Sequence, residues 1–330
     1  MAAHETINEL KSKIFEVTNQ NFVETALQVF RFQYENTMVY KNYIDLLKRD
    51  VNSIQQIEDI PFLPISLFKT HIVAINHNAE KIFESSGTTG QITSKHYVSD
   101  LNIYEESFFK CFNMFFGNAE DYCILGLLPS YLERNNSSLI YMVKELIQKS
   151  NKPESSFYLN EYEQLFKTIS ELEKRQQPYI LFGVTFALLE FSEKFPINIS
   201  YGTIIETGGM KGRGKELTRA ELHEILRQRF QTSNISSEYG MTELLSQAYL
   251  KQNEKFEAPP WMKILIRDVY NPFQYVANGQ SGAINVVDLA NLYSCSFIET
   301  ADMGRLYSNN SFEVLGRIDN SEIRGCNLLV

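Results

Sequence analysis

The sequence predicts an α/β protein with a doubly wound, mainly parallel sheet. From about residue 80 onward, short apolar runs alternate with longer stretches that have helical periodicity, and 44% of all residues are hydrophobic. Strands buried on both faces are apolar throughout, and parallel strands need helical crossovers, so this alternation is typical of the class. The expected strands are residues 122–128, 179–183 and 203–205, and the expected helices are residues 140–150, 165–174 and 219–230.

The two ends of the chain differ in the spacing of their apolar residues. Apolar residues recur at helical spacing through the first fifty residues, which predicts a helical lead-in. After Trp261, residues 263–269 and 283–289 alternate apolar and polar side chains between glycines, which predicts a small antiparallel β region. We therefore expect residues 1–260 to form the α/β core and residues 261–330 to form a β-rich region with a flexible tail.

Composition excludes several classes of protein. The chain carries 40 acidic and 31 basic residues, a formal net charge of -9, which argues against nucleic-acid binding. The cysteines form no CxxC pair and no zinc-like spacing with the histidines, and Cys111, Cys123 and Cys295 lie in apolar surroundings typical of a core. The first residues do not resemble a signal peptide, and no apolar stretch reaches the ~20 residues of a membrane span. We expect a cytoplasmic protein without a membrane span.

A glycine- and hydroxyl-rich loop follows the apolar pair Ile82 and Phe83. Small residues let backbone N–H groups approach phosphate oxygens, and the hydroxyls add donors. The loop lacks the Lys-Ser/Thr pair of a P-loop, and its alternative interpretation is a flexible surface turn. The candidate phosphate-binding residues are Ser85, Ser86, Gly87, Thr88, Thr89 and Gly90.

Three further motifs follow this loop along the chain. They are Glu-Thr-Gly-Gly at residues 206–209, Ser-Glu-Tyr-Gly-Met-Thr-Glu at residues 237–243, and Glu-Thr-Ala-Asp at residues 299–302 with Gly-Arg-Ile-Asp at residues 316–319. Each alone is an ordinary turn, helix start or surface charge. Together and in this order, they resemble the motifs of the adenylate-forming superfamily of acyl-CoA ligases, amino-acid adenylation domains and luciferase-like enzymes. The resemblance implies that superfamily's N-terminal domain fold and an ATP-dependent ligase.

The resemblance assigns the nucleotide base and the α-phosphate to two of these motifs. The turn at Gly208 and Gly209 would lie against the adenine. Tyr239, which precedes Gly240, would stack on the base, and Thr242 would approach the α-phosphate.

The resemblance also assigns the metal and the ribose. Glu243 would hold Mg²⁺, because substrate carboxylate and phosphate are both anions and a divalent ion offsets their repulsion. Asp302 would accept hydrogen bonds from the ribose hydroxyls, and Arg317 would reach the same sugar or a phosphate. Ala301 stands where the family usually has glycine.

The C-terminus resembles one branch of the superfamily. Most members continue beyond the Gly-Arg-x-Asp motif with a mobile domain that carries a catalytic lysine, whereas eleven residues follow Asp319 here. A shortened end with a nearby cysteine, Cys326, resembles the LuxE-type acyl-protein synthetases, as do residues 128–134, 208–213 and 324–326. We expect the mobile domain to be absent, with Lys211 and Arg213 as candidates to replace its lysine.

The resemblance implies that Cys326 carries the acyl group. A thiolate attacks an acyl-adenylate readily and gives a thioester, and Arg324 would favour the thiolate. The alternative is a free cysteine at a frayed terminus.

We therefore expect a ligase that activates a fatty or other carboxylic acid with ATP and Mg²⁺, then transfers the acyl group to Cys326. One alternative passes the acyl group to coenzyme A or a carrier protein. Another is a catalytically silent nucleotide- or acyl-binding subunit of a reductase complex. The resemblance also suggests an acyl-CoA reductase, an acyl carrier or an acyltransferase as a partner.

Overall fold

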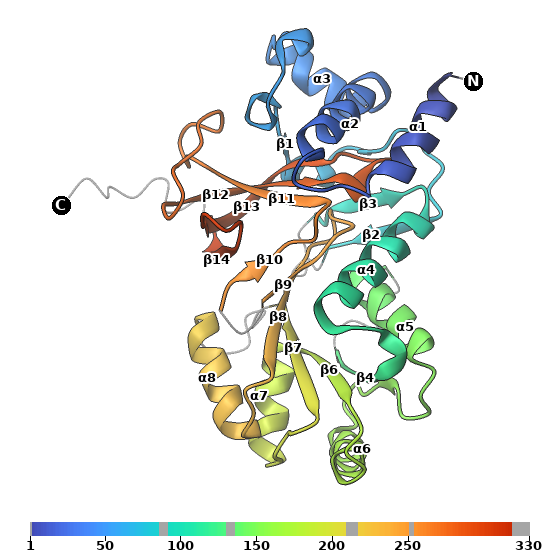
Figure 1. Cartoon of the computed structure of the whole chain (residues 1–330), viewed down its shortest axis with the longest axis vertical. Coiled ribbons are helices and arrows are strands. Elements are labelled where there is room, and N and C mark those ends of the chain that lie inside the picture. Colours follow the sequence, from blue (N-terminus) through green and yellow to red (C-terminus); the bar gives the residue numbers. More distant parts are fainter. Residues whose placement is uncertain (1, 86–91, 130–135, 209–216, 251–253, 319–330) are drawn as a thin grey trace, which may run out of the picture. The chain divides into compact units, whose positions relative to one another are not determined.

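The computed structural model describes residues 2–85, 92–129, 136–208, 217–250 and 254–318. Contacts between residues divide the chain into two compact units (Figure 1). We call them the antiparallel unit, which comprises Met1–Glu80, His96–Ser99 and Pro260–Val330, and the parallel unit, which comprises Lys81–Lys95 and Asp100–Pro259. The domain boundary near residue 260 stays a prediction.

The parallel unit is built on the sheet that the apolar runs predict. Its strand order is β10-β9-β8-β7-β6-β4-β5, and the neighbours from β8 to β5 are parallel. Every residue of β4 and β6 is buried, which explains why these strands are apolar throughout. The strands are β4 (Cys123–Leu127), β5 (Ser156–Phe157), β6 (Tyr179–Val184), β7 (Gly202–Thr207), β8 (Ile235–Tyr239), β9 (Ala248–Leu250) and β10 (Phe256–Glu257).

Helices cover both faces of this sheet. Figure 1 shows α7 and α8 on one side of β6, β7 and β8, with α4 and α5 on the other. The α8 helix begins with a capping box between Thr218 and Glu221, which is why it starts at Arg219. The helices are α4 (Leu101–Phe116), α5 (Ser138–Ser150), α6 (Tyr162–Lys174), α7 (Thr185–Lys194) and α8 (Arg219–Phe230), with the 3-10 turn η4 (Ala119–Asp121). The predicted doubly wound α/β architecture is confirmed.

The antiparallel unit confirms the predicted β region near the C-terminus. Its strands run in the order β11-β12-β13-β14, and the short β1 pairs with β13 in parallel. The bounds are β1 (Leu63–Pro64), β11 (Met262–Arg267), β12 (Ser281–Asp288), β13 (Phe297–Leu306) and β14 (Phe312–Arg317). The strand β2 (Lys81–Glu84) belongs to the parallel unit, and β3 (Lys95–Val98) leads from the parallel to the antiparallel unit.

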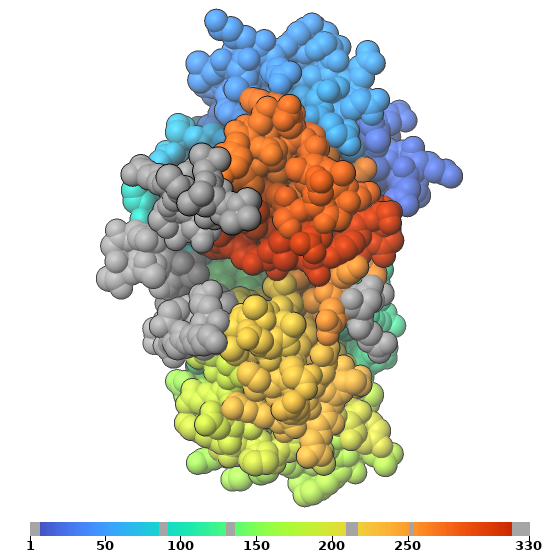
Figure 2. All heavy atoms as spheres, turned by 90° about the vertical axis from the view of Figure 1, so that its left-hand side faces the viewer, coloured from blue at the N-terminus to red at the C-terminus, as the bar shows by residue number. Residues whose placement is uncertain are grey.

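The N-terminal helices belong to the antiparallel unit. The side chain of Gln33 donates to the carbonyls of Asn291 and Leu292 and accepts from the amide of Ser296. Figure 2 shows these N-terminal segments, in blue, against the orange-to-red C-terminal strands. The elements are α1 (Ala2–Lys13), α2 (Phe22–Asn36) and α3 (Met38–Leu46), with the 3-10 turns η1 (Val51–Ser53), η2 (Ile57–Asp59), η3 (Ile65–Lys69) and η5 (Leu289–Asn291).

The predicted core cysteines are confirmed, because Cys111, Cys123 and Cys295 are buried and unbridged. Across the part of the chain that the structure describes, no helix has both the length and the apolar character that a bilayer crossing requires.

Candidate active site

Two predicted nucleotide motifs meet at one edge of the parallel sheet. The β7 strand ends with Glu206 and Thr207, and β8 ends with Glu238 and Tyr239. The strands pair in register, with Thr207 opposite Glu238. Ligands of open α/β sheets bind outside the carboxyl ends of parallel strands, so this edge is the place where a nucleotide is expected.

Glu206 is the centre of a buried hydrogen-bond chain at this edge. Its Oε1 lies 2.5 Å from the hydroxyl of Thr185, which is the first residue of α7, and its Oε2 accepts from the Ser237 hydroxyl at 2.9 Å. The chain reaches the predicted adenine turn, because Thr185 Oγ1 also donates to the Gly208 carbonyl at 3.0 Å. Gly208 has φ +74°, a left-handed conformation that glycine adopts without strain. One carboxyl group therefore connects α7, β8 and the turn.

The chain of hydrogen bonds extends to α8 through a histidine. His223 Nε2 lies 2.8 Å from Ser237 Oγ. Burial, with smaller contributions from the charges of Arg219 and Arg227, lowers the pKa of His223 to about 4, so this ring is neutral at neutral pH. Since the single Ser237 hydroxyl hydrogen is donated to Glu206, His223 must donate from Nε2 to complete the chain.

Burial raises the pKa of Glu206 above its usual value, against the opposing effects of the Thr185 hydrogen bond and the Arg219 charge. A protonated Glu206 would resolve the demands on Thr185. The carboxyl would donate to Thr185 Oγ1, and the threonine hydrogen would then be available to the Gly208 carbonyl. A neutral glutamic acid at this position would therefore satisfy both contacts of Thr185.

A second acid, Glu238, lies beside this chain. The Thr207 hydroxyl donates to Glu238 Oε2 at 2.5 Å. Desolvation, and to a smaller extent the charge of Glu206, raises the pKa of Glu238 to about 7, although the Thr207 bond lowers it. A Cβ on Gly240 would lie 2.3 Å from Glu238 Oε1, so glycine leaves room for this carboxyl group. Close packing against Glu238 therefore explains why the motif has glycine at position 240.

The remaining described residues of this motif have varied exposure. Tyr239 is buried and its ring centroid lies 5.9 Å from that of Phe256. The same Phe256 ring also contacts Arg219, whose Cζ lies 4.6 Å from the ring centroid. Thr242 is partly exposed, whereas Glu243 is buried.

The base of the predicted phosphate loop is held by Ser85. Its amide donates to the Ser94 carbonyl at 3.0 Å, and its hydroxyl accepts from the Ser94 amide at 2.9 Å. Several predicted residues lie outside the described part of the chain, namely Ser86, Gly87, Thr88, Thr89, Gly90, Gly209, Lys211, Arg213 and Cys326.

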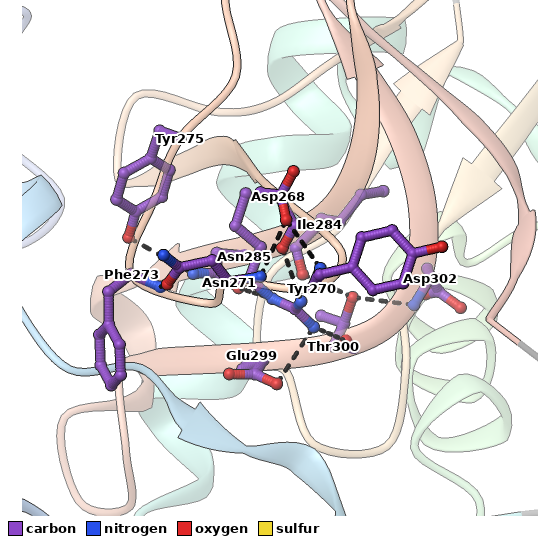
Figure 3. Close-up of polar contacts among 11 residues, drawn as sticks. Asp268, Tyr270, Asn271, Phe273, Tyr275, Ile284, Asn285, Glu299, Thr300 and Asp302 are labelled. Atoms are coloured by element: carbon purple, nitrogen blue, oxygen red, sulfur yellow. Dashed lines mark hydrogen bonds and ion pairs between the residues drawn. The ribbon is translucent and has the colours of Figure 1, made fainter. Parts of the chain in front are cut away.

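The antiparallel unit brings the two predicted ribose residues together. Asp302 on β13 pairs with Arg317 on β14, and Arg317 Nε lies 3.6 Å from Asp302 Oδ1. The Asp302 side chain is 15% exposed and that of Arg317 is 79% exposed. Figure 3 shows Asp302 next to Thr300, whose hydroxyl accepts from the Asp302 amide at 3.1 Å. A partly buried carboxylate thus lies beside a solvated arginine.

Sequence reasoning missed most of the residues that support these motifs. Thr185 and His223 lie outside every motif, and Glu238 had no assigned role. The signal for Glu238 was an acidic residue at the end of a buried parallel strand. Nothing in the sequence connects Thr185 or His223 to the turn, because only the fold brings them there.

The described residues also test the fit of a divalent metal. Among them, no group of three or more His, Cys, Asp or Glu side chains could hold an ion.

Solved structures with the same fold are adenylate-forming ligases. An open conformation of 2-hydroxyisobutyryl-CoA ligase in complex with 2-HIB-AMP and CoA matches with a TM-score of 0.65 and 10% identity, over 94% of this chain and 78% of that one. ATP-bound MatB from Rhodopseudomonas palustris gives 0.54 and 16%, over 72% and 47%. The amide bond synthetase McbA from Marinactinospora thermotolerans gives 0.50 and 13%, over 72% and 49%. The match with MatB and McbA spans about half of each of those chains.

The class of fold is therefore the adenylate-forming one that the motifs predict. No curated protein sequence matches the chain significantly. The chain belongs to the family "Acyl-protein synthetase, LuxE", whose sequence profile matches residues 7–330.

Proposed function

We propose that this chain activates a fatty acid, or a related carboxylic acid, with ATP and transfers the acyl group to its own Cys326. The observation that carries the proposal is the family match over residues 7–330, which includes every motif of the candidate site. The acyl thioester would then serve an acyl-CoA reductase, an acyl carrier or an acyltransferase as partner.

The proposed chemistry has two steps. First, a carboxylate oxygen of the acid attacks the α-phosphorus of ATP, the bond between that phosphorus and the bridging oxygen breaks, and pyrophosphate leaves. Second, the Cys326 thiolate attacks the acyl carbon of the acyl-adenylate, and AMP leaves with the bonding electrons. Part of the free energy released when the bond between the α- and β-phosphates breaks is thereby retained in the thioester.

The roles of the base-binding residues follow from the sheet edge. In this proposal the turn at Gly208 and Gly209 lies against the adenine, and Tyr239 with Gly240 forms the stacking surface. Thr185, through its bond to the Gly208 carbonyl, fixes the turn before ATP arrives. A turn that is already ordered loses less conformational entropy when it binds a ligand.

The roles at the phosphates and ribose complete the proposal. The loop from Ser85 to Gly90 holds the triphosphate, and Thr242 approaches the α-phosphate. Asp302 and Arg317 bind the ribose. Glu243 would hold Mg²⁺, which, when bound, supplies positive charge that offsets the repulsion between carboxylate and phosphate.

Exchange of labelled pyrophosphate into ATP tests the first step. We expect exchange with at least one acid from a panel of fatty and aryl acids, and a loss of exchange in Glu243→Ala. No exchange with any acid, or unchanged exchange in Glu243→Ala, contradicts the proposal. ATP binding without exchange would instead indicate a silent nucleotide-binding subunit.

Covalent labelling with radioactive acid tests the second step. Wild type should carry the label after ATP is added, and Cys326→Ser should not. Cys123→Ser is the matched control, because burial raises the pKa of the Cys123 thiol to about 11 and leaves it unreactive. Equal labelling of wild type and Cys326→Ser removes the cysteine from the mechanism.

A second candidate is transfer to an external thiol. One matched structure contains CoA together with an acyl-adenylate, and the match covers 94% of this chain. This candidate predicts that Cys326→Ser forms a full yield of acyl-CoA when CoA is supplied. If thioester forms only with Cys326 intact, the external-acceptor candidate fails.

A further inference from the structure

The segment that carries Asp302 is a bulge in the antiparallel sheet. Asn285 of β12 lies opposite Glu299 of β13, whereas Ala283 lies opposite Met303. Two residue steps on β12 therefore face four steps on β13, and the extra residues include Thr300 and Asp302. Bulges of this kind turn side chains away from the direction that the regular pleat would give them. The bulge thus determines where the Asp302 carboxylate points.

A buried arginine, Arg267, contacts this bulge through Glu299 and Thr300. It is the last residue of β11, and its side chain is 5% exposed. Its Nη2 donates to the Thr300 carbonyl at 3.3 Å and lies 3.1 Å from Glu299 Oε1. The same guanidinium nitrogen therefore contacts Glu299, where the regular pairing stops, and Thr300, which lies inside the bulge.

The other donors of Arg267 fix the guanidinium plane. Nε donates to Asn285 Oδ1 at 3.1 Å, and Nη1 donates to the Asp268 carbonyl at 3.4 Å. Asn285 in turn donates from Nδ2 to the Tyr275 hydroxyl at 3.4 Å, which orients its amide. Four of the five N–H groups that a guanidinium can donate are thus directed at named acceptors. Lysine cannot reproduce this planar set of contacts.

Backbone bonds complete the support of the bulge. The Thr300 hydroxyl donates to the Ile284 carbonyl at 2.8 Å and accepts from the Asp302 amide. The Ala301 carbonyl accepts from the Ile318 amide at 2.7 Å. Within the described part of the chain, the side chain from another strand that donates to the Thr300 carbonyl is that of Arg267, so its removal leaves this carbonyl without that donor.

We propose that Arg267 is a positioning residue that holds the bulge at Thr300 so that Asp302 meets the ribose of the nucleotide. The inference rests on the proposed function, because it takes Asp302 as the ribose acceptor. The inference gives the buried Arg267, whose guanidinium is bonded within the chain, no direct contact with the nucleotide. The effect of Arg267 therefore depends on the two ribose hydroxyls and is absent for a nucleotide that lacks them.

The test compares ATP with 2′,3′-dideoxy-ATP, which lacks both hydroxyls, by calorimetric dissociation constants on the full chain. Wild type should bind ATP more tightly by a factor on the order of 100, the value of two hydrogen bonds to a carboxylate. Asp302→Ala should bind the two nucleotides almost equally. Arg267→Lys should reduce the discrimination about tenfold while its affinity for the dideoxy nucleotide stays unchanged.

Two further variants keep the test decisive. Glu299→Gln removes the charge partner of Arg267 at constant size, and it should reduce the discrimination in the same direction if Arg267→Lys fails to fold. Arg305→Lys is the matched control, since Arg305 lies on β13 and contacts Ser281 and Glu313 at the surface. It should retain full discrimination.

The outcomes separate this inference from the proposed function. If wild type and Asp302→Ala discriminate equally, Asp302 is not the ribose acceptor and the role of Arg267 is overturned with it, whereas pyrophosphate exchange tests the ligase activity independently. If Asp302→Ala loses discrimination but folded Arg267→Lys and Glu299→Gln keep it, only the role of Arg267 is overturned. An equal loss of affinity for both nucleotides in Arg267→Lys also overturns it, because that result indicates general damage.

Discussion

The two units support their acidic residues in different ways. In the parallel unit, Glu206 and Glu238 contact hydroxyl groups, and desolvation raises the pKa of each. In the antiparallel unit, Glu299 and Asp302 each lie within 4 Å of an arginine. A hydroxyl group can donate to a carboxylate or accept from a protonated carboxyl group, whereas an arginine can only donate and therefore favours the ionised form. Burial also raises the pKa of Glu299, and the charge of Arg267 opposes that rise. One arrangement supports a backbone turn through hydroxyl groups, and the other supports a bulge through an arginine.

This comparison predicts the largest effect for removal of the Glu206 carboxyl group. Glu206→Ala removes the carboxyl partner of the buried Thr185 and Ser237 hydroxyls, which keep only their contacts with the Gly208 carbonyl and His223. It should lower the free energy of unfolding by about 4 kcal/mol, because each unsatisfied buried group costs 1–3 kcal/mol. Glu206→Gln, which imitates a neutral carboxyl group, should cost about 1 kcal/mol. Urea unfolding measures both values, and equal losses would contradict the neutral hydrogen-bond chain.

The pH dependence of stability provides the second test. The pKa of Glu238 is about 7 in the folded chain, against 4.5 for the ordinary side chain. Between these values the folded state keeps a proton that the unfolded state has lost, so this contribution is complete below pH 4.5 and disappears as pH rises through 7. The loss amounts to at most about 3 kcal/mol. Glu238→Gln should remove this part of the slope in urea unfolding at several pH values; an unchanged slope assigns it to other groups.

The smallest effect on stability is expected at Arg317. Its side chain is 79% exposed, and its distance to Asp302 is 3.6 Å. Such an exposed pair contributes little, so Arg317→Ala should change the free energy of unfolding by less than about 0.5 kcal/mol. Its affinity for ATP should nevertheless fall, since the proposed function gives Arg317 a ligand contact. A large loss of stability with normal ATP affinity would reverse the assignment.

The regular elements were predictable because each depends on a local pattern. The apolar run at residues 179–183 became β6, and the predicted helix at residues 219–230 is α8. Burial on both faces requires apolar side chains throughout a strand, and a capping box specifies where a helix begins. These signals need no information about distant parts of the chain.

The supporting residues were not predictable, because their roles arise from pairing between distant segments. Arg267 is an ordinary strand residue in the sequence, and only the register of β12 and β13 brings it to the bulge. Thr185 reaches Glu206 across 21 positions. A sequence motif identifies residues that are expected to bind a ligand. The residues that hold the motif in place can be identified only from the tertiary structure.

The contacts of Gln33 have a consequence for folding. Its bonds to the segment around Ser296 connect residues 263 positions apart, whereas the parallel unit consists mainly of one continuous stretch, Asp100–Pro259. Closing so long a loop costs chain entropy before any contact compensates for it, and such non-local contacts slow folding. During synthesis, the strands of the parallel unit are all available before β11 is made. The contacts of the helix that carries Gln33 with Asn291, Leu292 and Ser296 can form only after those residues have been synthesised.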